Sequence, residues 1–152
     1  MTETAVIAVS RNDERRLDKL ASAATDSLDD DGQAIVLHVF DGTEYDDLTE
    51  RLNLPTGGAD ASDELARRHS VASDVAERLD ADGVDVSVRG AVGTESDAIL
   101  DVADDVGADL VVIGGRKRSP SGKALFGSTA QTVLLEADCP VTFVKEDRKA
   151  LA

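Results

Sequence analysis

One glycine-rich segment in the second half of the chain carries residues that could bind an anion. From Leu110 to Leu135 the sequence contains no Asp or Glu, although the whole chain holds 31 acidic and 16 basic residues. Four of the basic residues fall within eight positions of this segment: Arg116, Lys117, Arg118 and Lys123. This segregation of charge predicts an anion-binding loop in an otherwise acidic protein.

The backbone and hydroxyl groups of the same segment suit the phosphates of a nucleotide. Glycines expose backbone N–H groups, and an expected helix start adds hydroxyls and about half a positive charge. The residues concerned are Gly114, Gly115, Gly127, Ser128 and Thr129. A plainer interpretation stays open, in which the glycines permit turns, Ser128 only caps its helix, and the basic residues pair with acidic neighbours.

Residue spacing excludes two common nucleotide motifs. The Walker A motif needs a hydroxyl residue after its Gly-Lys pair, and here Gly122-Lys123 is followed by Ala124. The dinucleotide fingerprint needs glycines after the first strand, where this chain has Ser10-Arg11-Asn12. The same tripeptide lacks the acidic pair of a response regulator and the glycine-rich loop of adenylate-transferring enzymes.

No arrangement of side chains in the sequence predicts catalysis or a metal centre. There is no Ser-His-Asp order, nucleophile elbow or close carboxylate pair. His38 and His69 have no partner at metal-ligand spacing, and Cys139 is the single cysteine. We expect a packed or hydrogen-bonded His38, a solvated His69 and a Cys139 in the core. The chain is therefore expected to be a non-enzyme without a structural metal.

Length and composition limit the class of protein. The chain has 152 residues, which fits one domain, and 41% of them are apolar, enough for a layered core. No stretch reaches the roughly 20 apolar residues of a membrane helix, and the N-terminus lacks the pattern of a secretory signal. One cysteine excludes an intrachain disulfide, and the formal net charge of −15 disfavours nucleic-acid binding. We therefore expect a cytoplasmic protein.

The acidic surface has a distinctive composition. Asp outnumbers Glu by 22 to 9, and Arg outnumbers Lys by 11 to 5. Such a surface is typical of proteins from salt-loving organisms, because at molar salt the Debye length is about 3 Å and self-repulsion is screened. We expect a halophilic protein, with an ordinary acidic surface as the alternative.

Five short apolar runs separated by helix-like segments predict an α/β protein. The runs are Ala5–Val9, Ala34–Phe40, Val84–Val88, Leu110–Ile113 and Val141–Val144. Three of them are nearly continuous and β-branched, which is typical of strands buried on both faces. Apolar residues at helical spacing predict helices over Asp13–Leu28, Ser62–Leu79, Thr94–Val106 and Ser128–Ala137. The alternation predicts a doubly wound, mostly parallel sheet with helices on both faces. Residues 41–61 are expected to form a surface loop or partial lid.

Helix boundaries carry their own signals. Thr94–Asp97 and Ser128–Gln131 resemble capping boxes. Gly32 and Gly83 each follow an aspartate-rich stretch and are expected to end helices in the left-handed conformation. Because ligands of doubly wound sheets bind at the carboxyl ends of the strands, the segments leaving the strands are the candidate site.

The C-terminal half resembles the signature of the universal stress protein family. The resemblance rests on Gly107–Gly114, Gly114–Thr129, Val133–Leu135 and Ala137–Val141, with a weaker match over Val36–Val39. The order of elements also matches, so the resemblance covers a single domain, residues 1–152. It implies a five-stranded parallel sheet in the order 3-2-1-4-5, with the first and fourth strands flanking the cleft. It also implies a homodimer formed through the last strand, by Val141, Thr142, Phe143 and Val144.

One branch of this family binds ATP through the pattern G-x2-G-x9-G-[ST], which the resemblance places on Gly114 and Gly127-Ser128. Lys117 stands at the second glycine, where its side chain crowds the backbone but could offer a charge to a phosphate. Ser10 replaces an acidic residue that contacts the nucleotide, and Val39 matches a position near the adenine. The resemblance thus implies ATP or a related adenine nucleotide, with Mg²⁺, held by Ser10, Val39, Gly114, Gly115, Arg116, Lys117, Gly127, Ser128 and Thr129.

The expected role is regulatory. Occupancy of the cleft would change residues 41–61 and 115–126 and so alter partner binding, with at most slow hydrolysis of ATP. The alternative interpretation is a nucleotide-free dimeric stress protein that acts through protein contacts.

Overall fold

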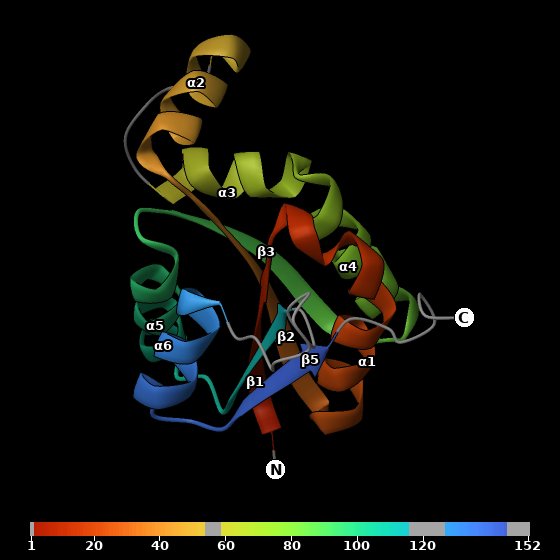
Figure 1. Ribbon diagram of the computed structural model, residues 1–152. Coiled ribbons are helices and arrows are strands. Elements are labelled where there is room, and N and C mark those ends of the chain that lie inside the picture. Colours follow the sequence, from red (N-terminus) through yellow and green to blue (C-terminus); the bar gives the residue numbers. More distant parts are fainter. Residues whose placement is uncertain (1, 54–58, 116–126, 146–152) are drawn as a thin grey trace, which may run out of the picture.

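The computed structural model describes residues 2–53, 59–115 and 127–145. Its centre is one sheet of five parallel strands (Figure 1): β1 (Thr2–Val9), β2 (Leu28–Phe40), β3 (Asp85–Val92), β4 (Leu110–Gly115) and β5 (Val141–Lys145). The strand order is β3-β2-β1-β4-β5. This confirms the predicted doubly wound α/β fold and its 3-2-1-4-5 order.

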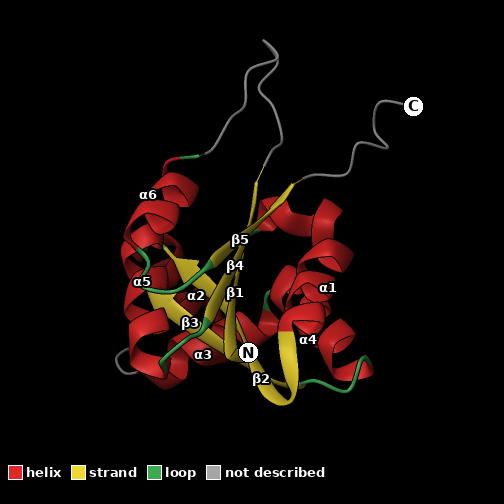
Figure 2. Ribbon diagram, turned by 90° about the horizontal axis from the view of Figure 1, so that it is seen from below, coloured by secondary structure: helices red, strands yellow, loops and turns green. Residues whose placement is uncertain are grey.

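Helices cover both faces of the sheet. They are the 3-10 helix η1 (Arg11–Arg16), α1 (Leu17–Ser27), α2 (Gly42–Leu52), α3 (Ala59–Arg68), α4 (Ser70–Ala81), α5 (Glu95–Val106) and α6 (Ser128–Glu136). Seen from below, α1 and α4 lie on one side of the strands, and α5 and α6 lie on the other (Figure 2). Within the described residues, no helix is long and apolar enough to cross a membrane.

Alternating side chains of the central strand divide the core between the two layers. Ala5, Ile7 and Val9 of β1 pack in the cluster that contains α1 and α4. Val6 and Ala8 pack in the cluster that contains α5 and α6. Because β1 is buried on both faces, its sequence is a continuous apolar run rather than an alternating one.

His69 divides the helix predicted over Ser62–Leu79 into α3 and α4. Its backbone is extended, with φ −73° and ψ 125°, and its Nδ1 accepts a hydrogen bond from the Ala72 N–H over 3.4 Å. The expectation of a solvated His69 is therefore wrong, since the side chain caps α4 and is half-buried. The apolar pattern hid the break because both helices bury residues at the same period.

The loop expected over residues 41–61 contains a helix. The Asp41 carboxylate accepts a hydrogen bond from the Glu44 N–H over 2.7 Å and so caps α2. Tyr45 and Leu48 pack against Phe40 at the end of β2. Two partly buried side chains in a polar segment were too weak a pattern to predict this helix. Residues 54–58, which hold Pro55 and the Gly57-Gly58 pair, lie outside the described residues.

The helix exit predicted at Gly32 is also wrong. Gly32 lies inside β2, and the left-handed glycines of the described residues include Gly83 (φ 83°), as predicted, and Gly107 (φ 64°). A Cβ at position 32 would lie 2.9 Å from Leu28 Cδ2 and 3.2 Å from the Thr2 carbonyl oxygen. Close packing at the start of β2, rather than a left-handed turn, explains this glycine.

Candidate functional site

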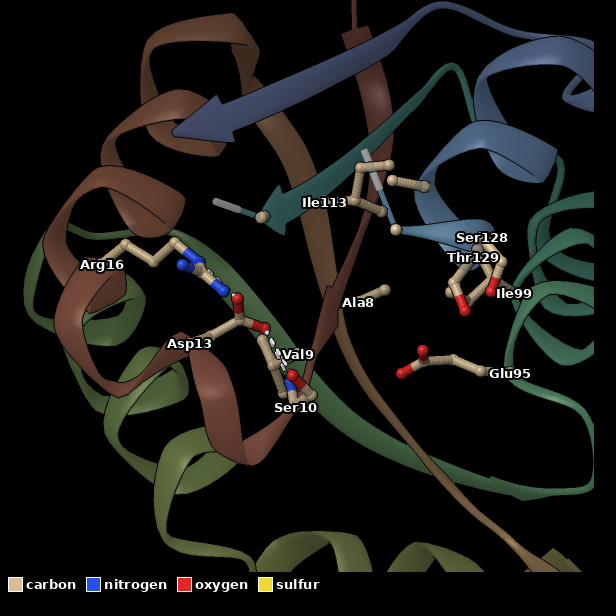
Figure 3. A pocket seen from close by; sticks show the side chains of 14 residues that line it. Ala8, Val9, Ser10, Asp13, Arg16, Glu95, Ile99, Ile113, Ser128 and Thr129 are labelled. Atoms are coloured by element: carbon tan, nitrogen blue, oxygen red, sulfur yellow. Dashed lines mark hydrogen bonds and ion pairs between the residues drawn. The ribbon is translucent and has the colours of Figure 1, made fainter. Parts of the chain in front are cut away.

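Two adjoining hollows open at the carboxyl ends of the central strands. The first, named the β4 hollow, has a volume of about 500 Å³ and is lined by residues of β1, η1, β4, α5 and α6 (Figure 3). The second, named the β2 hollow, has a volume of about 740 Å³ and is lined by the end of β2, by residues that follow β1, β2 and β3, and by His69. Ser10 and Glu95 line both hollows, which together form the cleft. Both volumes fall in the range of roughly 300–1,000 Å³ that is typical of small-molecule sites.

Strand topology explains why the cleft opens here. β1 pairs with β2 on one side and with β4 on the other. The chain leaves β1 toward the face covered by α1, and α6 lies on the opposite face (Figures 1 and 2). The helices that follow β1 and β4 therefore lie on opposite faces of the sheet, with a crevice between the ends of the two strands.

A buried ion pair that sequence reasoning missed forms one wall of the β4 hollow. Arg16 Nε donates a hydrogen bond to Asp13 Oδ1 over 2.6 Å, and the two side chains are only 5% and 4% exposed. The other carboxylate oxygen, Oδ2, accepts hydrogen bonds from the Ser10 N–H over 2.7 Å and from the Ser10 hydroxyl over 3.3 Å. The Asp13 charge is thus compensated, and Ser10 is held in place by the same carboxylate.

The glycines of the site serve different purposes. A Cβ at Gly114 would lie 2.6 Å from Arg16 Nε and 2.7 Å from Asp13 Oδ1. A Cβ at Gly115 would lie 2.6 Å from Phe143 Cζ, whereas one at Gly127 would have nothing within 4 Å. Packing of the protein itself therefore requires the two glycines of β4, but not Gly127.

The first turn of α6 forms the opposite side of the β4 hollow. Gly127 is the N-cap residue, and its carbonyl accepts a hydrogen bond from the Gln131 N–H over 3.0 Å. The expectation that Ser128 caps the helix is wrong, because Ser128 is already the first helical residue. Ser128 is exposed, and no described residue forms a hydrogen bond with its hydroxyl. This helix start offers backbone N–H groups and hydroxyls, with no acidic residue in its first turn.

Two stacked histidines line the β2 hollow. The rings of His38 and His69 lie 3.9 Å apart between centroids, at an interplanar angle of 21°. His38 Nδ1 donates a hydrogen bond to the Val9 carbonyl oxygen over 3.0 Å, which confirms a packed, hydrogen-bonded histidine. Burial lowers the pKa of His69 to about 4, with smaller contributions from the charges of His38 and Arg11. Val39 lies beside them in the same hollow.

The structure gathers most of the residues named from the sequence. Those that line the β4 hollow are Ser10, Gly114, Gly115, Gly127, Ser128 and Thr129. Val39 lines the adjoining β2 hollow, and Arg116 and Lys117 lie outside the described residues. Sequence reasoning missed Asp13, Arg16 and Glu95. The spacing of Ser10, Asp13 and Arg16 at successive intervals of three was the available signal for the first two.

Cys139 lies away from both hollows. Cys139 packs against the core cluster under α5 and α6, and burial raises the pKa of its thiol. A thiol shifted in this direction is less reactive than an ordinary one. Among residues 2–53, 59–115 and 127–145, no group of three or more His, Cys, Asp or Glu side chains is placed to hold a metal ion.

The strand order defines a doubly wound α/β fold of the adenine nucleotide alpha hydrolase-like type. Residues 1–145 match the universal stress protein family, and the chain belongs to this family. A universal stress protein of Mycolicibacterium smegmatis is 36% identical over 120 residues, which are 78% of this chain and 92% of that protein.

Solved structures show the same fold. A universal stress protein from Archaeoglobus fulgidus is 31% identical, with a TM-score of 0.64, over 95% of this chain and all of that one. A universal stress protein solved in complex with cAMP is 23% identical, with a TM-score of 0.63, over 96% and 98% of the two chains. An Archaeoglobus fulgidus universal stress protein in complex with dAMP is 24% identical, with a TM-score of 0.58, over 94% and 98%.

Proposed function

We propose that this chain is a regulatory protein that binds ATP or a related adenine nucleotide in the cleft. The observation that carries the proposal is the continuity of the two hollows through Ser10 and Glu95, at the end of β1. A nucleotide has a base at one end and phosphates at the other, joined by a sugar. The cleft likewise consists of the β2 hollow and the β4 hollow, which adjoin at Ser10 and Glu95. The cAMP and dAMP complexes of relatives support an adenine nucleotide as the ligand.

In this proposal the phosphates lie against the first turn of α6. Gly127, Ser128 and Thr129 supply N–H groups and hydroxyls there, and the base lies in the β2 hollow beside Val39. Mg²⁺ accompanies ATP through its phosphates. Occupancy of the cleft alters the segments around it and so the binding of partners, and hydrolysis is slow at most.

Charge in the described part of the β4 hollow does not by itself favour a phosphate. Arg16 compensates Asp13, which leaves the carboxylate of Glu95 as the uncompensated charge of the described lining. The positive charge for a triphosphate therefore has to come from the segment between β4 and α6, which holds Arg116, Lys117, Arg118 and Lys123. The proposal assigns that role chiefly to Arg116 and Lys117.

A homodimer through β5 is part of the proposal. β5 pairs with β4 on one side and is the last strand in the sheet order. Its residues Val141, Thr142 and Phe143 are half-buried and Val144 is buried, while Leu135 at the end of α6 is 77% exposed. Apolar surface beside an edge strand favours association with another chain. The same observation supports the second candidate function, a nucleotide-free dimer that acts through protein contacts.

We also propose that the acidic surface adapts the protein to concentrated salt in the cytoplasm. The support is the net charge of −15 and the excess of Asp over Glu. Screening at high ionic strength removes the self-repulsion of such a surface.

The site assignment is tested by titrating Mg-ATP into two variants of the full chain. Lys117→Glu reverses a charge and should weaken the affinity about tenfold or more, and Ser128→Ala removes a hydroxyl and should weaken it several-fold. Ser70→Ala is the matched control, because Ser70 is the exposed first residue of α4 and lines neither hollow. Unchanged affinity in both test variants, with normal unfolding curves, would overturn the assignment.

A further inference from the structure

Glu95 stands at the junction of the two hollows. It is the first residue of α5 and, with Ser10, belongs to the lining of both chambers. In Figure 3 its carboxylate points into the space between Ser10 and Thr129. The side chain is half-buried, and no described residue forms a hydrogen bond or ion pair with its carboxylate.

An unpaired, half-buried carboxylate requires hydrogen-bond donors. Its two oxygens accept hydrogen bonds and donate none when ionised. The opposite wall of the junction offers no free donor, because the Ser10 N–H and hydroxyl are already directed at Asp13 Oδ2, over 2.7 Å and 3.3 Å. A ligand that crosses the junction can therefore bring the donors that Ser10 does not supply to Glu95.

The order of base, sugar and phosphates in a nucleotide determines which hydrogen-bond donors lie beside Glu95. With the phosphates at Gly127–Thr129 and the base beside Val39, the sugar is the part that must pass between Ser10 and Glu95. A ribose carries two neighbouring hydroxyls, whose O–H groups match the two oxygens of one carboxylate. A deoxyribose carries one fewer.

We propose that Glu95 is a specificity-determining residue that accepts hydrogen bonds from the 2′- and 3′-hydroxyls of the ribose, so that the cleft selects ribonucleotides over deoxyribonucleotides. The inference rests on the proposed function. Glu95 also repels phosphate, which directs the charged end of the ligand toward α6 and away from the junction. A site built to hydrogen-bond a hydroxyl discriminates against the analogue without it, because its buried polar group is then left unpaired.

The test compares dissociation constants for ATP, 2′-deoxy-ATP and 3′-deoxy-ATP by calorimetry, in excess Mg²⁺ and again without Mg²⁺. In the unaltered chain each deoxy analogue should bind about tenfold or more weakly than ATP, as expected for a lost hydrogen bond to a charged group. In Glu95→Ala the ratio of deoxy to ATP constants should fall close to one. Glu95→Gln keeps one acceptor oxygen and should give an intermediate ratio.

Asp97→Ala is the matched control, because Asp97 lies in the same first turn of α5 but is exposed and lines neither hollow. It should keep the discrimination of the unaltered chain. The readout is the ratio of the dissociation constants of deoxy-ATP and ATP. A general change in the charge of the cleft alters both constants by the same factor and leaves this ratio unchanged.

Each other outcome contradicts the inference in a distinct way. If the unaltered chain binds deoxy-ATP and ATP equally well, the inference is overturned while nucleotide binding stands. The same holds if Glu95→Ala keeps the preference for ATP. Equal loss of affinity for all three nucleotides in Glu95→Ala, seen only with Mg²⁺ present, would assign Glu95 to the metal instead and also overturn it. Absence of binding by any of the nucleotides overturns the proposed function, and this inference with it.

Discussion

Arg16 donates a hydrogen bond to Asp13 over 2.6 Å, and this buried pair lies directly against Gly114 at the end of β4. Packing within the protein is therefore sufficient to form this wall of the β4 hollow without a ligand. The first glycine of the expected nucleotide-binding pattern has a structural reason to be glycine. Gly127, at the other end of that pattern, has open space around its Cα.

The two glycines should respond differently to alanine. Gly114→Ala places a Cβ within 2.7 Å of both Asp13 and Arg16 and should lower the free energy of unfolding by about 1–3 kcal/mol through overpacking. Gly127→Ala, at φ −62° with no contact within 4 Å, should change it by about 0.5 kcal/mol or less. Urea unfolding of both variants measures the difference. Equal destabilisation by the two substitutions would contradict the claim that packing requires glycine at position 114 but not at position 127.

Removing one partner of the Asp13–Arg16 ion pair should strongly lower the free energy of unfolding. Arg16→Met leaves the Asp13 carboxylate buried without its counter-charge and should lower the free energy of unfolding by about 3–5 kcal/mol. Combining it with Asp13→Asn should recover part of that loss, since no unpaired charge remains. A double-mutant cycle in urea measures the coupling, and additive losses would show that the two side chains do not depend on each other.

His69 should make the fold less stable in mild acid. Its folded-state pKa of about 4 lies below the ordinary value of 6.5, so the unfolded chain binds a proton first as pH falls. The unfolded state therefore holds more protons between pH 6.5 and 4, and stability decreases from about pH 7 toward pH 4. His69→Asn keeps a capping side chain for α4 but does not titrate, and it should flatten this dependence. Urea midpoints at pH 7 and pH 5 provide the check, and an unchanged difference between them would argue against a buried neutral His69.

Salt should raise the thermal stability. The net charge of −15 repels itself over a Debye length of about 30 Å at 0.01 M salt but only about 3 Å at 1 M. We expect the melting temperature to rise steadily from low to molar KCl. A melting temperature that stays level or falls over this range would count against a halophilic surface.

The architecture was predictable from sequence because the local patterns agree with the packing. Val6 and Ile7 face opposite layers of the core, which is why β1 is a continuous apolar run. Alternation of such runs with helical patterns is enough to predict a parallel sheet. The break at His69 was not predictable, because α3 and α4 bury apolar residues at the same period and the ring of His69 stacks on His38, which is distant in sequence.

The residues of the cleft were predictable only where a glycine-rich segment or a family pattern identified them. Gly114, Gly127 and Ser128 belong to such a pattern, and the structure places them in the β4 hollow. Asp13 and Glu95 look in the sequence like two more surface carboxylates of a strongly acidic chain. The spacing of Asp13 from Ser10 and Arg16 signals a local contact, but the place of both carboxylates in the cleft follows from the tertiary arrangement of η1 and α5 around the ends of β1 and β4.

Extraction of nucleotide from freshly purified protein kept in high KCl, followed by calorimetric titration with Mg-ATP, tests the central claim most directly. The account predicts either one adenine nucleotide per chain in the extract or saturable binding with that stoichiometry, without appreciable turnover of ATP. An empty protein that binds no Mg-ATP at high or at moderate salt would contradict it. The basic segment would then require another anion or an acidic protein partner, and the nucleotide-free dimer would become the better description.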